Sequence, residues 1–222
     1  MQITHDTESA PHPPDAAAWN GQRLLTARPQ TPRPAPQRPA GAARVWFDRV
    51  ALDPAAPEDR AGIDGTSAAL RRLIDAETAA GVPLRRILLG GFSMGGEQAL
   101  CTALGDPALA RGLAGAFALS SFLADSSFVP PALAALAGES GAAAAAPPPR
   151  IAPVLKCHGQ ADGLIPIDWG RRTAARLRAV GLGEDRLGWR EYPGLDHTLA
   201  PDELADLRTW IAARLDPGTP GP

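Results

Sequence analysis

The sequence lacks the long apolar run that a membrane-spanning helix needs. Apolar residues make up 45% of the chain but come in short runs, whereas a bilayer requires about 20 in succession. A surplus of basic residues is missing too, because 22 basic side chains stand against 24 acidic ones and the formal net charge is −2. Phosphate recognition normally needs a basic surface. These absences argue against an integral membrane protein and against a nucleic-acid-binding protein.

Cysteine is scarce as well. Cys101 and Cys157 cannot build a disulfide framework and are not spaced as metal ligands, so we expect a reducing compartment. The first 14 residues include Asp6 and Glu8 and have no apolar core, unlike a secretory signal or an Arg/Ser-rich transit peptide. From these features the sequence predicts a cytoplasmic protein.

The sequence contains two low-complexity segments, one before the expected domain and one within it. Residues 1–40 hold eight prolines and little apolar periodicity, which predicts a largely disordered arm. Residues 130–150 are rich in Ala, Gly and Pro and have few bulky side chains with which to pack, so we expect a loop inserted into the domain. The domain itself is expected over residues 41–216, with a flexible tail over residues 217–222.

Helix and strand patterns alternate along the rest of the chain. Apolar stripes with helical spacing predict helices, and short continuous apolar runs predict strands that are covered on both faces. The expected helices are residues 58–80, 95–104, 168–180 and 201–215, and the expected strands are residues 87–89, 113–119, 151–157 and 187–192. This alternation predicts an α/β fold with a mainly parallel sheet and helices on both faces. Functional side chains should then gather at the carboxyl ends of the strands.

One short motif at such a strand end is typical of a catalytic serine. The run Gly91-Phe92-Ser93-Met94-Gly95 follows the expected strand at residues 87–89 and precedes a helix. In this context a GxSxG sequence is typical of a nucleophile elbow, a strained strand-to-helix turn in which the flanking glycines make room for the backbone. Ser93 is therefore the candidate nucleophile. The alternative is an ordinary glycine-rich turn with a capping serine.

A serine hydroxyl needs a base to take its proton as it attacks. Of the four histidines, His5 and His12 fall in the predicted arm. In hydrolases with a nucleophile elbow the chain order is Ser, then Asp or Glu, then His, so the base must come late. This order favours His197, whereas His158 is better interpreted as a hydrogen-bonded histidine that supports the loop after its strand.

Four aspartates could orient the imidazole of His197. Asp162 lies just beyond a strand end and is the prediction, since its carboxylate could meet an imidazole from the next strand-to-helix loop. Asp168 resembles a helix N-cap, Asp196 is the sequence neighbour of His197, and Asp125 follows an earlier strand. Asp125 stays an open but weaker alternative.

Five motifs occur together in a fixed order over residues 44–215. They are Val45-Trp46-Phe47-Asp48, Gly90-Gly91-Phe92-Ser93-Met94-Gly95-Gly96, Ala118-Leu119-Ser120-Ser121-Phe122-Leu123, Cys157-His158-Gly159-Gln160-Ala161-Asp162 and Tyr192-Pro193-Gly194-Leu195-Asp196-His197. In these motifs the chain resembles the acyl-protein thioesterase/lysophospholipase family of carboxylesterases, above all its lysophospholipase-like branch.

The resemblance implies an α/β-hydrolase fold and the hydrolysis of acyl thioesters or carboxylic esters, with an acylated protein or a small acyl ester as substrate. Ser93, Asp162 and His197 take the triad positions, and no metal or organic cofactor is implied. Phe122 and Leu123, just beyond a strand end, are candidates for the lining of an acyl pocket, with a place in the core as the alternative.

The sequence departs from this family in one respect. Members begin with a strand and a His-Gly-x-Gly loop that supplies one oxyanion donor, and no such motif precedes residues 23–44. We therefore expect an N-terminally truncated version of the fold that keeps the other donor, the N–H of Met94. Loss of one donor lowers turnover by about 10²–10³-fold. A shortened gene product, a variant with another donor, and a hydrolase-derived acyl-binding protein without turnover are the three interpretations.

Overall fold

The structure is a computed structural model, and it describes residues 45–138 and 151–215. The predicted arm over residues 1–40, the predicted tail, the remainder of the predicted loop beyond residue 138, and the question of a preceding strand and glycine loop all lie outside the described residues.

The described residues form one sheet of four parallel strands in the order β1-β2-β3-β4. The strands are β1 Leu88–Phe92, β2 Gly115–Leu119, β3 Val154–Gly159 and β4 Leu187–Tyr192. All neighbouring pairs are parallel, so the four carboxyl ends lie at one edge of the sheet. The predicted parallel α/β architecture is confirmed.

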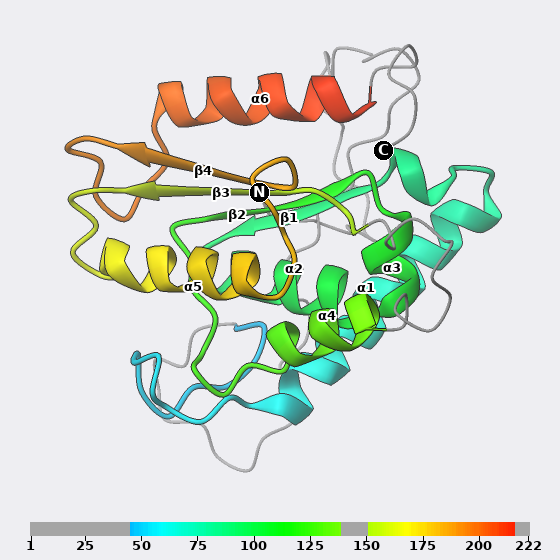
Figure 1. Cartoon of the computed structure of the whole chain (residues 1–222), viewed down its shortest axis with the longest axis horizontal. Coiled ribbons are helices and arrows are strands. Elements are labelled where there is room, and N and C mark those ends of the chain that lie inside the picture. Colours follow the sequence, from blue (N-terminus) through cyan, green and yellow to red (C-terminus); the bar gives the residue numbers. More distant parts are fainter. Residues whose placement is uncertain (1–44, 139–150, 216–222) are drawn as a thin grey trace, which may run out of the picture. The chain divides into compact units, whose positions relative to one another are not determined.

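Helices cover both faces of this sheet, as the sequence predicts. Helix α6 (Pro201–Leu215) lies on one side, and α2 (Met94–Gly105) and α5 (Ile167–Ala179) lie on the other (Figure 1). The remaining helical segments are α1 (Arg60–Ala79), the short 3-10 turn η1 (Leu84–Arg86), α3 (Pro107–Gly112) and α4 (Val129–Gly138). None of the described helices is long and apolar enough to cross a membrane.

Small residues let the central elements approach each other closely. Every residue of β2 is buried, as expected of a strand covered on both faces. Gly90 pairs with Phe117 in the register of β1 and β2, and a Cβ atom at Gly90 would lie 2.4 Å from the Phe117 ring. The ring therefore covers a position that only glycine can occupy without a shift of its neighbours.

The prediction of a loop over residues 130–150 is wrong for residues 130–138. Helix α4 runs from Val129 to Gly138 and buries Val129, Leu133 and Leu136. These positions are spaced as i, i+4 and i+7, so they form one apolar stripe on the helix. The abundance of alanine and proline around them obscured this stripe in the sequence.

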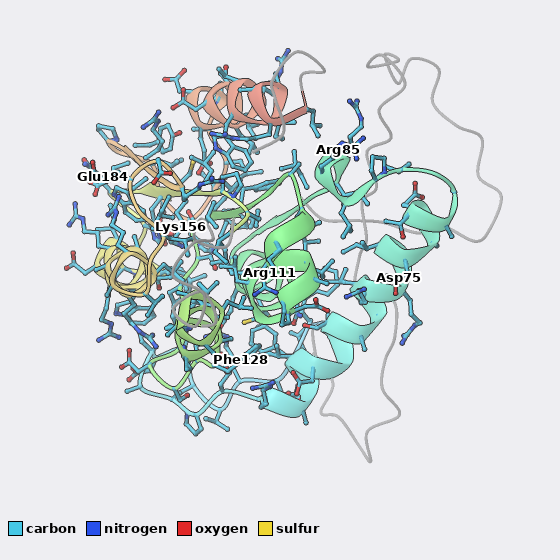
Figure 2. The ribbon with its side chains drawn as sticks, turned by 45° about the vertical axis from the view of Figure 1, so that its right-hand side comes forward. Asp75, Arg85, Arg111, Phe128, Lys156 and Glu184 are labelled. Carbon is cyan, nitrogen blue, oxygen red and sulfur yellow. The ribbon has the colours of Figure 1, made fainter. Side chains whose placement is uncertain are left out.

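Lys156 is buried in the middle of the sheet. It is the one lysine of the chain and lies in β3, in the interior, whereas Asp75, Arg85 and Glu184 lie at the surface (Figure 2). Its Nζ donates a hydrogen bond to the carbonyl oxygen of Ser121 at 2.9 Å. Burial lowers the pKa of Lys156 to about 7, because the charged ammonium is poorly solvated there.

This burial predicts a pH-dependent stability. The unfolded chain keeps the lysine proton up to a pKa of about 10.4, whereas the folded chain releases it near pH 7, so unfolding takes up a proton between these two values. Below pH 7 the burial of Lys156 destabilises the folded chain by its full amount, and this destabilisation disappears as the pH rises. The free energy of unfolding should therefore rise by up to about 1.4 kcal/mol per pH unit from about pH 7 to 10.

Urea unfolding of wild type and Lys156→Met at pH 6, 7, 8 and 9 checks this expectation. The difference in unfolding free energy between the two proteins should change steadily above pH 7, because methionine has no proton to take up. Arg85→Met is the control, since Arg85 is exposed and a guanidinium keeps its proton over this range. Parallel curves for all three proteins would contradict the buried-lysine interpretation.

Candidate active site

Ser93 occupies a strained turn between β1 and α2. Its backbone has φ 54° and ψ −126°, a region that L-residues seldom adopt and that is typical of functional sites. The turn is held by the Ser93 N–H, which donates to the carbonyl of Leu119 at 2.8 Å. A Cβ atom at Gly91 would lie 2.4 Å from the Gly95 carbonyl carbon, and one at Gly96 would lie 2.9 Å from the Gly91 oxygen. Gly91 and Gly96 therefore allow the sharp strand-to-helix turn.

The structure brings Ser93, His197 and Asp162 together in one hydrogen-bonded chain. His197 Nε2 lies 3.0 Å from Ser93 Oγ, and His197 Nδ1 lies 2.8 Å from Asp162 Oδ2. A carboxylate only accepts hydrogen bonds, so Nδ1 carries the ring proton and Nε2 presents its lone pair to the serine hydroxyl. This is the tautomer that a general base requires.

The Asp162 carboxylate is fixed from its other side. Its Oδ1 accepts the backbone N–H groups of Leu164 at 3.0 Å and Ile165 at 2.8 Å. The Asp162 side chain is fully buried, whereas that of His197 is 14% exposed. The imidazole of His197 is thus reachable from solvent, while the carboxylate of Asp162 is not.

The other candidate carboxylates have different partners. Asp196 Oδ1 accepts the backbone N–H groups of Gly163 and His197, at 2.9 and 2.7 Å, and these bonds hold the pKa of Asp196 below its usual range. Asp125 pairs with Arg172 at 3.0 Å.

Asp168 does not cap helix α5. The N-cap is Pro166, and Asp168 lies in the first turn, where it pairs with Arg171 at 2.9 Å. The N-cap prediction is therefore wrong by two residues, because the proline that ends the preceding loop begins the helix earlier.

Met94 is the first residue of α2. The N–H groups in the first turn of a helix have no acceptor within that helix, and they lie at the positive end of its dipole. Met94 directly follows Ser93, the N-cap of this helix, and the role of its N–H as an oxyanion donor stays a prediction.

Phe122 and Leu123 are each only 2% exposed. Phe122 packs edge-on against Trp169 at a centroid distance of 4.9 Å, and the Leu123 N–H donates to Thr173 Oγ1 at 2.9 Å. Neither side chain offers surface to a ligand in this structure, and contact of either with an acyl chain stays a prediction.

A buried ion pair that the sequence analysis missed lies directly behind the serine turn. Glu97, in the first turn of α2, pairs with Arg49, and the two side chains are 1% and 16% exposed. The Arg49 guanidinium also lies 4.6 Å from the centre of the Phe122 ring. The signal in the sequence was a single charged residue, Glu97, in a helix that has no other charged side chain.

Breaking this ion pair should destabilise the fold. Arg49→Met leaves the Glu97 carboxylate buried without its partner, and we expect the free energy of unfolding to fall by about 3–5 kcal/mol. Urea denaturation measures this fall. The double variant Arg49→Met/Glu97→Met should recover most of the loss, because an apolar pair needs no charge compensation there. Equal losses in the single and double variants would show that the pair contributes only packing.

The two thiols are poor rival nucleophiles. Cys101 and Cys157 are free and buried, and burial raises the pKa of both thiols, that of Cys157 to about 12. Neither forms the reactive thiolate near neutral pH. Within the described residues, no group of three or more His, Cys, Asp or Glu side chains could hold a metal ion.

Comparisons with known proteins identify the family and the fold. The model of the phospholipase/carboxylesterase family matches residues 27–215. Lysophospholipase-like protein 1 of Mus musculus is 36% identical over 193 residues, which cover 84% of this chain and 73% of that protein. Acyl-protein thioesterase 1 of Mycosarcoma maydis is 32% identical over 176 residues, covering 75% of this chain and 67% of that protein. The crystal structure of Zea mays acyl-protein thioesterase 2 superimposes with a TM-score of 0.56 at 27% identity and covers 77% of this chain and 72% of its own.

Proposed function

This chain belongs to the phospholipase/carboxylesterase family, and from that membership we propose that it is a serine hydrolase of carboxylic esters or acyl thioesters. The observation that carries the proposal is the chain of contacts from Ser93 Oγ to His197 Nε2 and from His197 Nδ1 to Asp162 Oδ2, at 3.0 and 2.8 Å. The first distance lets His197 take the proton of the serine hydroxyl, and the second lets Asp162 orient the ring and stabilise its protonated form.

The reaction proceeds through an acyl-enzyme. Ser93 Oγ attacks the carbonyl carbon of the substrate while His197 Nε2 takes the hydroxyl proton. Asp162 stabilises the imidazolium that forms, and the N–H of Met94 donates to the oxyanion. The imidazolium then protonates the leaving alcohol or thiol. A water molecule, activated by the same imidazole, releases the carboxylic acid and restores the free serine.

The chemistry of this site accepts both an oxygen ester and a thioester. Two relatives of the chain are named lysophospholipase-like protein 1 and acyl-protein thioesterase 1. The proposed substrates are therefore an acylated protein or a small acyl ester. The two free thiols support a reducing compartment such as the cytoplasm as its location.

A fluorophosphonate probe tests the proposal. The wild-type protein should react once, with loss of fluoride and a phosphonyl group bound to the peptide that contains Ser93, because only an activated serine displaces fluoride at a useful rate. Mass spectrometry of the digested protein locates the label, and heat-denatured protein serves as the unlabelled control. A folded protein that takes up no probe would contradict the proposal and would favour a binding protein without hydrolase activity.

A further inference from the structure

His158 is a buried histidine that the proposed mechanism does not use. It is the fifth residue of β3 and is fully buried. Its Nε2 lies 2.9 Å from the carbonyl oxygen of Ile165. A carbonyl oxygen only accepts hydrogen bonds, so Nε2 carries the ring proton and donates it to Ile165.

The rest of the ring is closely enclosed. Nδ1 of His158 is buried and has no hydrogen-bond partner among the described residues. A Cβ atom at Gly170 of α5 would lie 2.5 Å from Nδ1 and 3.0 Å from the Trp189 ring. The titratable groups that interact electrostatically with the ring are Lys156, Asp162 and His197. Burial lowers the pKa of His158, so the ring stays neutral with one proton on Nε2.

The contact with Ile165 leads directly to the triad carboxylate. While the Ile165 carbonyl is held by His158, the Ile165 N–H donates to Asp162 Oδ1 at 2.8 Å. His158 Nε2 also lies 3.5 Å from Asp162 Oδ2. That oxygen is the one that accepts the Nδ1 proton of His197. The His158 N–H therefore donates to the turn that holds the Asp162 carboxylate. It also lies near the carboxylate oxygen that faces His197, at a distance longer than its hydrogen bond to Ile165.

We propose that His158 is a positioning residue for the hydrolysis reaction: through the Ile165 carbonyl it fixes the loop that aims Asp162 Oδ2 at His197. The inference rests on the proposed function, because it assigns His158 a role in the same triad. It requires the N–H donor at the Nε2 position and not merely a bulky side chain in the core.

Two substitutions at position 158 distinguish the need for an N–H donor from the need for a bulky side chain. Methionine fills the volume without a donor, and we expect His158→Met to lower kcat by about 10–100-fold with KM within about twofold, since a small misplacement of a reacting group has effects of this size. The side-chain amide of glutamine can place an N–H near the position of Nε2. His158→Gln should therefore recover kcat to within about fivefold of wild type.

A third substitution moves the ring without changing its chemistry. Gly170→Ala places a methyl group against Nδ1 and should push the N–H away from Ile165, with a fall in kcat of about 10-fold or more. Gly65→Ala is the matched control, because Gly65 also lies within a helix and has no heavy atom within 4 Å of its Cβ position. The control should keep the wild-type kcat.

Proton NMR of the His197 Nδ1–H gives a readout that a purely structural role would not move. This resonance should be sharp in wild type and His158→Gln, and broadened or lost in folded His158→Met and Gly170→Ala. If His158→Met does not fold, the other two variants decide. Wild-type kcat and an unchanged resonance in Gly170→Ala or His158→Met would overturn the role of His158, whereas a wild type without turnover or probe labelling would overturn the proposed function itself.

Discussion

Ser93→Ala is expected to lower kcat for an ester or thioester by about 10⁶-fold, the size of effect seen when the nucleophile of a serine hydrolase is removed. The physical reason is that no acyl-enzyme can form without Oγ, and His197 then has no hydroxyl to activate. The fold should persist, because alanine removes one oxygen atom and leaves the hydrogen bond from the residue 93 N–H to the Leu119 carbonyl in place. Steady-state hydrolysis of an activated ester measures the loss.

Ser126→Ala is the matched control for that experiment. Ser126 lies at the surface, in a turn after β2, so its loss should leave kcat unchanged. Circular dichroism and thermal unfolding of both variants establish that they are folded. Turnover by Ser93→Ala at a tenth of the wild-type rate or more would exclude Ser93 as the nucleophile.

The second large effect is expected for Asp162→Asn, with a fall in kcat of about 10⁴-fold. The amide oxygen of asparagine can still accept the N–H groups of Leu164 and Ile165, so the loop should keep its shape. Its NH₂ group would then face His197 and favour the tautomer with the proton on Nε2. That proton would point at the Ser93 hydroxyl, and the imidazole could no longer act as its base.

The pH–rate profile and a matched variant check this explanation. Asp168→Asn changes an exposed carboxylate, 81% accessible, that pairs with Arg171, and it should retain wild-type kcat. In contrast to the alanine variant at position 93, Asp162→Asn should still take up the fluorophosphonate probe, only slowly. Equal activity of the two asparagine variants would show that Asp162 does not orient the base.

Most of the fold could be predicted because local pattern and tertiary packing agree. The strand at residues 187–192 and the helix at residues 201–215 have the predicted bounds, since a turn or a proline marks their ends. Helix α4 was missed because its composition indicates low complexity, while three large side chains determine the packing. Strand β3 begins at Val154 rather than at residue 151, because its pairing with Leu187 and not its apolar pattern sets the start.

The candidate site, like the fold, could be predicted in part. Chain order and strand ends were enough to select Ser93, Asp162 and His197, the three side chains that the structure joins. The pairing of Arg49 with Glu97 could not be predicted, since residues 48 positions apart carry no local sign of contact. For His158 the sequence predicted a hydrogen bond that supports the loop after its strand, and the structure has this bond, to the Ile165 carbonyl. The identity of that partner could not be predicted, because it depends on how the loop folds back on its own strand.

The close approach of Phe117 to Gly90 has a consequence for divergence within the family. A side chain at position 90 and a benzyl group at position 117 compete for one volume, so neither position can enlarge by itself. Relatives with alanine or serine at the first position should have a smaller residue at the second. An alignment in which these two positions vary independently would mean that the backbone of β1 can move aside, and with it the turn that presents Ser93.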